Sequence, residues 1–154
     1  AVGGDLVGKK NDSRTVAVIV WLSSYLESKR DLKRLEEQLE ETKESTIASA
    51  ECKGGMPKAK RTTDLSDYQV AVERIEQQIN QERMRKVKRL KEVRETIESI
   101  EDAKAKDILT YRYIRGYPWE EIARLIGYDI SWMFKIHKRA VEEISHKNPY
   151  KNML

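Results

Sequence analysis

The sequence predicts an all-α protein in which a long antiparallel helical hairpin is followed by a small C-terminal helix-turn-helix domain. Charged residues make up 36% and hydrophobic residues 39% of the 154 positions, and the chain contains only three Pro and one Phe. This usage is typical of long solvated helices with narrow apolar stripes. We expect four parts. Residues 1–15 are expected to be disordered or carried over from an expression vector. They are followed by a hairpin at 16–102 with a loop near 52–65, the sigma-like helix-turn-helix domain at 103–147, and a tail at 148–154.

The first long helix is predicted from about Val18 to Ala50. The stripe of apolar side chains along this helix is too narrow for a globular core but suits a coiled-coil seam, so the helix needs a partner helix. Gly54, Gly55 and Pro57 then interrupt the helical pattern and predict an exposed loop at which the chain reverses. The stripe consists of leucines at helical intervals, namely Leu22, Leu26, Leu32, Leu35 and Leu39.

The second long helix is predicted to start near Asp64 or Ser66, because either side chain can cap free amides, and to run to about Ile100. It carries the strongest basic cluster of the chain, which can track a phosphate backbone. We favour a different interpretation, in which these charges form a solvated face and neutralise the acidic end of the first helix. The basic cluster consists of Arg83, Arg85, Lys86, Lys88, Arg89, Lys91 and Arg94.

A short supporting helix is predicted from about Ala103, and Gly116 to Pro118 end it. Pro118 suits the first position of the following helix. Glu120 and Glu121 lie in the first turn of that helix, where the macrodipole favours negative charge.

The stretch from Trp119 to Lys138 has the pattern of two helices that meet at a steep angle. Such a corner needs a small residue where the helices touch and a residue tolerant of positive φ in the turn, and Ala123 and Gly127 meet these demands. Asp129 can cap the second helix, which continues to about Ser145. The second helix of such a unit usually enters a DNA groove. The apolar positions of the corner are Ile122, Ile126, Tyr128, Met133 and Ile136.

Several functional classes are disfavoured by composition. Cys52 is the only cysteine, so no intrachain disulfide or thiolate metal cluster is expected, and a reducing cytoplasm is the default compartment. The apolar run from Val16 to Leu22 is too short for a membrane span and lacks a clear signal-peptide cleavage site. No nucleophile, base and orienting group recur at usable spacing, so we expect neither an enzyme nor a cofactor. The net charge of +4 permits binding to nucleic acid.

The histidines and tryptophans of the C-terminal third could have a functional role, but we interpret them as packing residues. His137 and His146 lack a paired set of metal ligands, so we expect no metal and interpret His137 as a packing or phosphate-contacting residue. Trp119 and Trp132 are interpreted as core anchors rather than base-stacking platforms.

The C-terminal third resembles the ArpU-like phage transcriptional regulators, whose helix-turn-helix is similar to region four of sigma-70-type factors. Trp21 to Glu41, the loop at Gly54 to Pro57 and the helix from Asp67 onward are similar to the long N-terminal helices of that family. The resemblance covers residues 21 to 145 and is most specific in the last third. It is carried there by Leu109, Arg112, Tyr113, Ile114, Gly116, Trp119, Glu120, Glu121, Ile122, Ala123, Gly127, Tyr128, His137, Arg139 and Ala140.

This resemblance implies a DNA-binding transcriptional regulator of late genes in phages or prophages of Gram-positive bacteria, acting in the host cytoplasm. Its partners are double-stranded DNA, and additionally host RNA polymerase or a second copy of the chain. Four positions of the recognition helix would face the core: Met133, Ile136, Ala140 and Ile144. The DNA-facing candidates are Ile130, Ser131, Phe134, Lys135 and Lys138, with Arg139 as a further phosphate contact.

Ile130 and Ser131 depart from the family, which often has basic residues at the start of the recognition helix. Fewer phosphate contacts lower the affinity of one domain, so a dimer or a polymerase contact is expected to supplement it. Three alternatives stay open. They are a small-terminase-like component of DNA packaging, a helical interaction protein that does not bind DNA, and a purely structural helical bundle.

Overall fold

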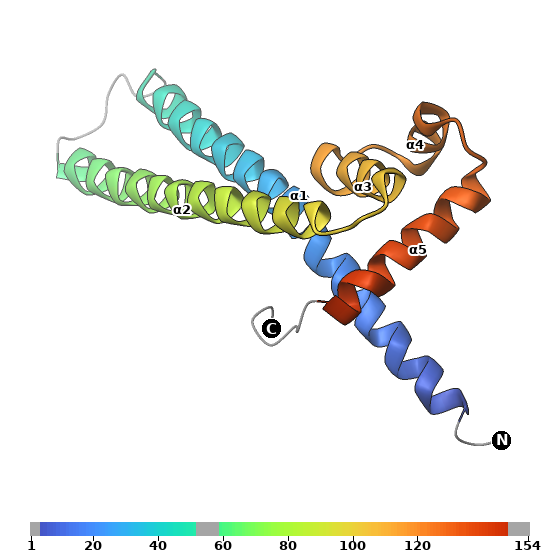
Figure 1. The fold of residues 1–154 in the computed structure, drawn as a ribbon. Coiled ribbons are helices and arrows are strands. Elements are labelled where there is room, and N and C mark those ends of the chain that lie inside the picture. Colours follow the sequence, from blue (N-terminus) through green and yellow to red (C-terminus); the bar gives the residue numbers. More distant parts are fainter. Residues whose placement is uncertain (1–3, 52–58, 148–154) are drawn as a thin grey trace. The chain divides into compact units, whose positions relative to one another are not determined.

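The computed structural model describes residues 4–51 and 59–147, with side chains described at 13–48 and 65–147, and these ranges contain helices but no strand (Figure 1). The predicted all-α class is confirmed. The predicted tail at 148–154, Cys52 and the Gly-Gly-Met-Pro segment at 54–57 lie outside the described residues. In chain order the elements are α1 (Gly4–Glu51), α2 (Ala59–Glu98), α3 (Ala103–Leu109), the π-helix η1 (Thr110–Arg115), α4 (Trp119–Ile126) and α5 (Ile130–Lys147).

Both long helices begin earlier than the apolar stripes predict. α1 begins at Gly4 and includes residues 4–15, which the sequence analysis placed outside the fold, and α2 begins at Ala59 instead of Asp64 or Ser66. A helix that is already nucleated gains one hydrogen bond for each residue added, whether or not that residue has an apolar partner. Hydrophobic periodicity therefore marks the packed part of such a helix and misses its ends.

The chain forms two compact units, which divide the long helices. The middle unit is Ser28–Val87, and the terminal unit combines residues 1–27 with residues 88–154. The predicted boundary between residues 102 and 103 falls inside the terminal unit.

In the middle unit, α1 and α2 lie side by side and run in opposite directions (Figure 1). Leu32, Ile75 and Ile79 form its small buried core, and Arg83 of α2 donates to Glu36 of α1 at 3.0 Å. Leu35 and Leu39 pack against the same core, as the narrow stripe predicted. With so few buried apolar side chains, this unit has the limited core of a two-helix seam rather than that of a globule.

The terminal unit has one larger apolar core, to which both long helices and all the C-terminal helices contribute. Its buried side chains from α1 and α2 lie against those of the C-terminal helices, which explains why the compact unit crosses residue 102. The core consists of Val18, Trp21, Leu22, Val93, Ile97, Ile100, Ala105, Ile108, Leu109, Tyr113, Ile122, Ala123, Met133, Ile136, Ala140, Val141 and Ile144.

Local signals delimit the short helices of the terminal unit. Asp102 caps α3 by accepting a hydrogen bond from the Lys104 amide at 3.0 Å. Gly116 ends η1 in the left-handed conformation with φ 76°, and a Cβ at this position would meet Leu26 at 3.5 Å, an ordinary contact. Within the described residues, no helix combines the length and apolarity needed to cross a membrane.

We predict that Leu109→Ala destabilises the terminal unit by about 2 to 5 kcal/mol, because it opens a cavity in the core at a fully buried position. The same substitution at the exposed Leu125 should change the free energy of unfolding by no more than about 0.5 kcal/mol. Urea unfolding followed by circular dichroism measures both values. Equal losses for the two variants would contradict the assignment of this core.

Candidate nucleic-acid interface

The turn between α4 and α5 has the glycine of positive φ that its residues predicted. Gly127 adopts a left-handed conformation with φ 72°, and its amide and that of Tyr128 both donate to the Ala123 carbonyl, at 3.0 and 3.2 Å. Ala123 is buried. Pro118 is the residue before α4 rather than its first helical position, because its ψ of 153° is extended and Trp119 begins the helix.

α5 begins as predicted with a cap at Asp129. The Asp129 carboxylate accepts a hydrogen bond from the Ser131 amide at 3.1 Å, and its carbonyl accepts one from the Met133 amide at 3.0 Å. These bonds satisfy two amides that would otherwise lack a partner at the helix start. The helix then runs to Lys147, slightly beyond the predicted end.

One face of α5 is buried in the core of the terminal unit. The four predicted core positions, Met133, Ile136, Ala140 and Ile144, are all buried. The structure adds His137 and Val141 to this face.

The opposite face of α5 carries most of the predicted DNA-facing residues. Ser131, Lys135, Lys138 and Arg139 are exposed, whereas Ile130 is half-buried and packs against the core, so less of its side chain is accessible. No Asp or Glu occurs from residue 130 to residue 141. We call the exposed residues Ser131, Lys135, Lys138 and Arg139 the outer face of α5.

Phe134 flanks the outer face and leans back onto α4. Its side chain is 42% exposed, and its ring meets that of Trp119 edge-on, with centroids 5.2 Å apart. Trp119 is half-buried against the core, with the guanidinium of Arg112 at 4.5 Å from the centroid of its ring. Trp119 therefore joins η1, α4 and α5, as expected of an anchor residue.

Trp132 is not the core anchor that the sequence analysis expected. Its side chain is 44% exposed, and the ammonium of Lys135 lies 5.9 Å from the centroid of its ring. The next residue, Met133, occupies the buried position. Because consecutive residues of a helix are about 100° apart, burial of Met133 leaves Trp132 at the side of the helix.

A buried polar pair holds the inner face of α5 against η1. The Tyr113 hydroxyl and Nε2 of His137 are 2.8 Å apart, and both residues are buried. Burial raises the pKa of Tyr113 to about 12, and the nearby Arg112 charge opposes this change. Burial also lowers the pKa of His137 to about 4, and Arg112 lowers it further. Both groups are therefore neutral near pH 7.

The sequence analysis identified His137 as a packing or phosphate-contacting residue, and the structure gives it a packing position. It did not identify Tyr113 as its partner, because the two residues are 24 positions apart and no local pattern links them. The aromatic contact of His137 with Trp119, with ring centroids 4.9 Å apart, also joins separate helices.

The π-helix η1 was not predicted. It follows α3 without a break and ends where the Tyr117 amide donates to the Tyr111 carbonyl at 3.0 Å. The Arg112 guanidinium donates to the Tyr117 carbonyl at 3.1 Å while it lies over Trp119. This wide turn thus places Arg112 against the first residue of α4.

The charges of the basic cluster on α2 are largely paired with nearby carboxylates. In the middle unit, Arg83 pairs with Glu36 of α1, and Arg85 pairs with Glu82 of its own helix at 3.0 Å. In the terminal unit, the residues Lys88, Arg89 and Lys91 pair with Glu92 or Glu95 of the same helix. Most of this pairing is therefore intrahelical, and among the side chains that the structure describes only Arg83 shows the predicted neutralisation of α1.

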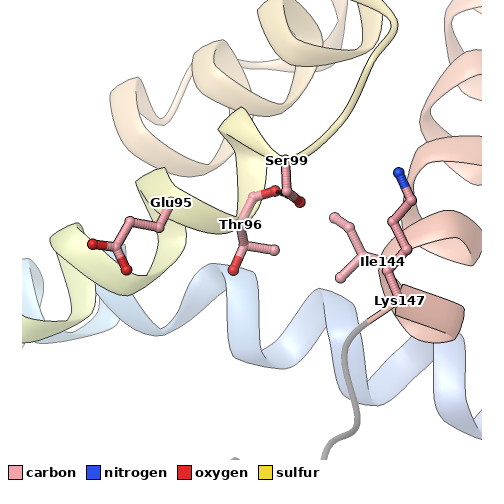
Figure 2. Close-up of a pocket in the computed structure, with 5 residues that line it drawn as sticks. All are labelled: Glu95, Thr96, Ser99, Ile144 and Lys147. Atoms are coloured by element: carbon pink, nitrogen blue, oxygen red, sulfur yellow. Dashed lines mark hydrogen bonds between the residues drawn. The ribbon is translucent and has the colours of Figure 1, made fainter.

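A shallow hollow of about 300 Å³ lies between the ends of α2 and α5 (Figure 2). The hydroxyls of Thr96 and Ser99 donate to carbonyls of α2, those of Glu92 at 2.9 Å and Thr96 at 2.6 Å respectively. Lys147 bonds Glu143 one turn earlier in α5. Glu95 pairs with Lys91 of the same helix. Because all these polar groups already have partners, the hollow offers a ligand little beyond the apolar surface of Ile144.

No family model, curated protein or solved structure matches the chain. The functional inference therefore rests on the residues and geometry of the chain itself.

We predict that Tyr113→Phe lowers the free energy of unfolding by about 1 to 3 kcal/mol, because it leaves Nε2 of the buried His137 without its partner. Tyr111→Phe is the matched control. Its half-buried ring stacks on Tyr117, and loss of its hydroxyl should cost no more than about 0.5 kcal/mol. Chemical denaturation measures the free energy of unfolding of both variants. Equal values for the two variants would contradict a stabilising role of the Tyr113–His137 hydrogen bond.

Stability should fall as the pH is lowered from about 6.5 toward 4, because the unfolded state protonates its imidazole at the ordinary pKa while folded His137 stays neutral to about pH 4. The slope contributed by this residue approaches about 1.4 kcal/mol per pH unit. Urea unfolding between pH 7 and pH 5 measures this dependence of stability on pH. His146→Gln, at an exposed position of the same helix, is the control and should show the same dependence as the unmodified protein. If the proton resonance of the His137 ring instead titrated near pH 6.5, the imidazole would not be shielded from protonation by burial, and this prediction would be wrong.

Proposed function

We propose that this chain is a DNA-binding transcriptional regulator of phage or prophage late genes, and that α4, the turn at Gly127 and α5 act as its helix-turn-helix. The observation that carries the proposal is the outer face of α5. It presents three cations in a segment without carboxylates, on the helix whose opposite face is buried in the core. A second helix of this kind is the element that enters the major groove in helix-turn-helix proteins.

The residues of the outer face have the chemistry that DNA requires. Lys135 and Lys138 can bind phosphates or guanine edges, and Arg139 can bind a further phosphate. Ser131 lies in the first turn, where its hydroxyl can donate to a phosphate near the positive end of the helix dipole. Glu142 and Glu143 follow this segment, so their negative charge favours contact through the N-terminal turns of α5.

The affinity of a single domain is expected to be modest. Three cations that each neutralise one phosphate give a salt dependence of about −3 in a plot of log K against log salt. A second copy of the chain or host RNA polymerase would add contacts, and the two paired helices of the middle unit offer a long surface for either partner. The similarity to ArpU-like regulators supports the assignment to late-gene control, with the hairpin serving in oligomerisation or partner contact.

We predict that Lys135→Ala and Lys138→Ala each weaken binding to double-stranded DNA, and that each lowers the salt slope by about 1 if the residue contacts a phosphate. Loss of a guanine contact would instead cost about 1 to 3 kcal/mol and relax sequence preference at one position. Fluorescence anisotropy with late-promoter fragments and random duplexes, over a series of salt concentrations, distinguishes the two contacts.

Lys33→Ala is the matched control, because Lys33 is also an exposed lysine, lies on α1 of the middle unit and pairs with Glu37. It should leave affinity and salt slope unchanged. The proposal fails if the protein prefers no phage late-promoter fragment over random DNA, with or without host RNA polymerase. A ring of many subunits in light scattering would instead favour a DNA-packaging component.

A further inference from the structure

Trp132 is a large aromatic side chain that stays partly exposed to solvent in the terminal unit. Trp21 is buried in the core, and Trp119 is covered by Arg112, Phe134 and His137. Trp132 is 44% exposed and is not one of the buried side chains of the core. A half-exposed indole presents an apolar face and an N–H donor to a ligand, so the groups around Trp132 decide what it can bind.

Two cationic residues lie on the same side of α5 as Trp132. Residues 132, 135 and 139 are separated by three and four positions, so they lie along one side of α5. The Lys135 ammonium lies 5.9 Å from the centroid of the indole ring, within the range of a cation–π contact. Arg139 is exposed one turn further on, and no carboxylate occurs between residues 130 and 141.

This combination suits a polyanion with apolar sugar surfaces better than it suits an apolar protein patch. The indole offers a flat apolar face to deoxyribose, and its Nε1–H is a donor for a phosphate oxygen. Lys135, held near the ring, supplies the positive charge. A protein-docking patch would instead be expected to gather several apolar side chains without like charges beside them.

We propose that Trp132 is a DNA-contacting residue that packs its indole against the sugar-phosphate backbone of a duplex, with Lys135 and Arg139 on the adjacent phosphates. The inference rests on the proposed function and adds an aromatic contact at the edge of the recognition helix. This contact is independent of sequence, because every nucleotide presents the same sugar and phosphate.

The test uses the full chain and a mixed-sequence DNA duplex of about 30 base pairs, roughly three helical turns. Because Trp132 is the most exposed of the three tryptophans, duplex binding should shield the protein fluorescence from acrylamide quenching. Trp132→Phe should remove most of this DNA-dependent change. Trp132→Ala should weaken duplex binding severalfold, because it removes both the apolar face and the Nε1–H donor from the contact.

Val20→Ala is the matched control, since Val20 is an exposed apolar residue of α1 in the terminal unit, and it should change neither the quenching nor the affinity. Circular dichroism should give unchanged helix content and melting temperature for the Trp132 variants, because the side chain lies outside the core. Trp132→Phe supplies a milder second variant if the alanine variant is unstable.

The outcomes separate this inference from the proposed function. Duplex binding with unchanged Trp132 quenching and undiminished affinity of Trp132→Ala would overturn the inference and leave the regulator proposal standing. Loss of self-association in Trp132→Ala, with DNA affinity intact, would assign the indole to a contact between copies and would also overturn it. Absence of any duplex binding by the unmodified protein would overturn both.

Discussion

Burial of one face of α5 is the packing constraint on which the other features of the terminal unit depend. Met133, Ala140 and Ile144 enter a core that is built by α3, η1, α4 and the terminal-unit parts of both long helices. Because the helix is rigid, burial of this face determines which side chains reach solvent. The cationic outer face is therefore a consequence of packing on the inner face.

The Tyr113–His137 hydrogen bond makes this packing more specific than apolar contacts alone. Apolar side chains can slide or rotate past one another at modest cost, whereas a buried hydroxyl and imidazole must meet within hydrogen-bond distance. Trp119 adds a second constraint through its contacts with His137 and Arg112. Together these contacts set the orientation of α5 relative to η1 and α4, and with it the orientation of the outer face.

Charge is used differently on the long helices and on α5. On α2, most of the described basic cluster pairs with carboxylates one turn away, which favours helix stability and solubility over attraction to a polyanion. Lys135, Lys138 and Arg139 have no ion pair among the described residues, so their charge is available to a ligand. The position of unpaired charge is thus more informative than the net charge of +4.

Local chemistry allowed the sequence to determine the all-α class, the turn at Gly127, the cap at Asp129 and the inner face of α5. Each depends on helical periodicity or on the conformational preference of one residue. Only the tertiary structure paired Tyr113 with His137, placed Trp132 at the surface and joined both sides of residue 102 in one core. These features depend on side chains far apart in the sequence, and local patterns carry no information about which of them will meet.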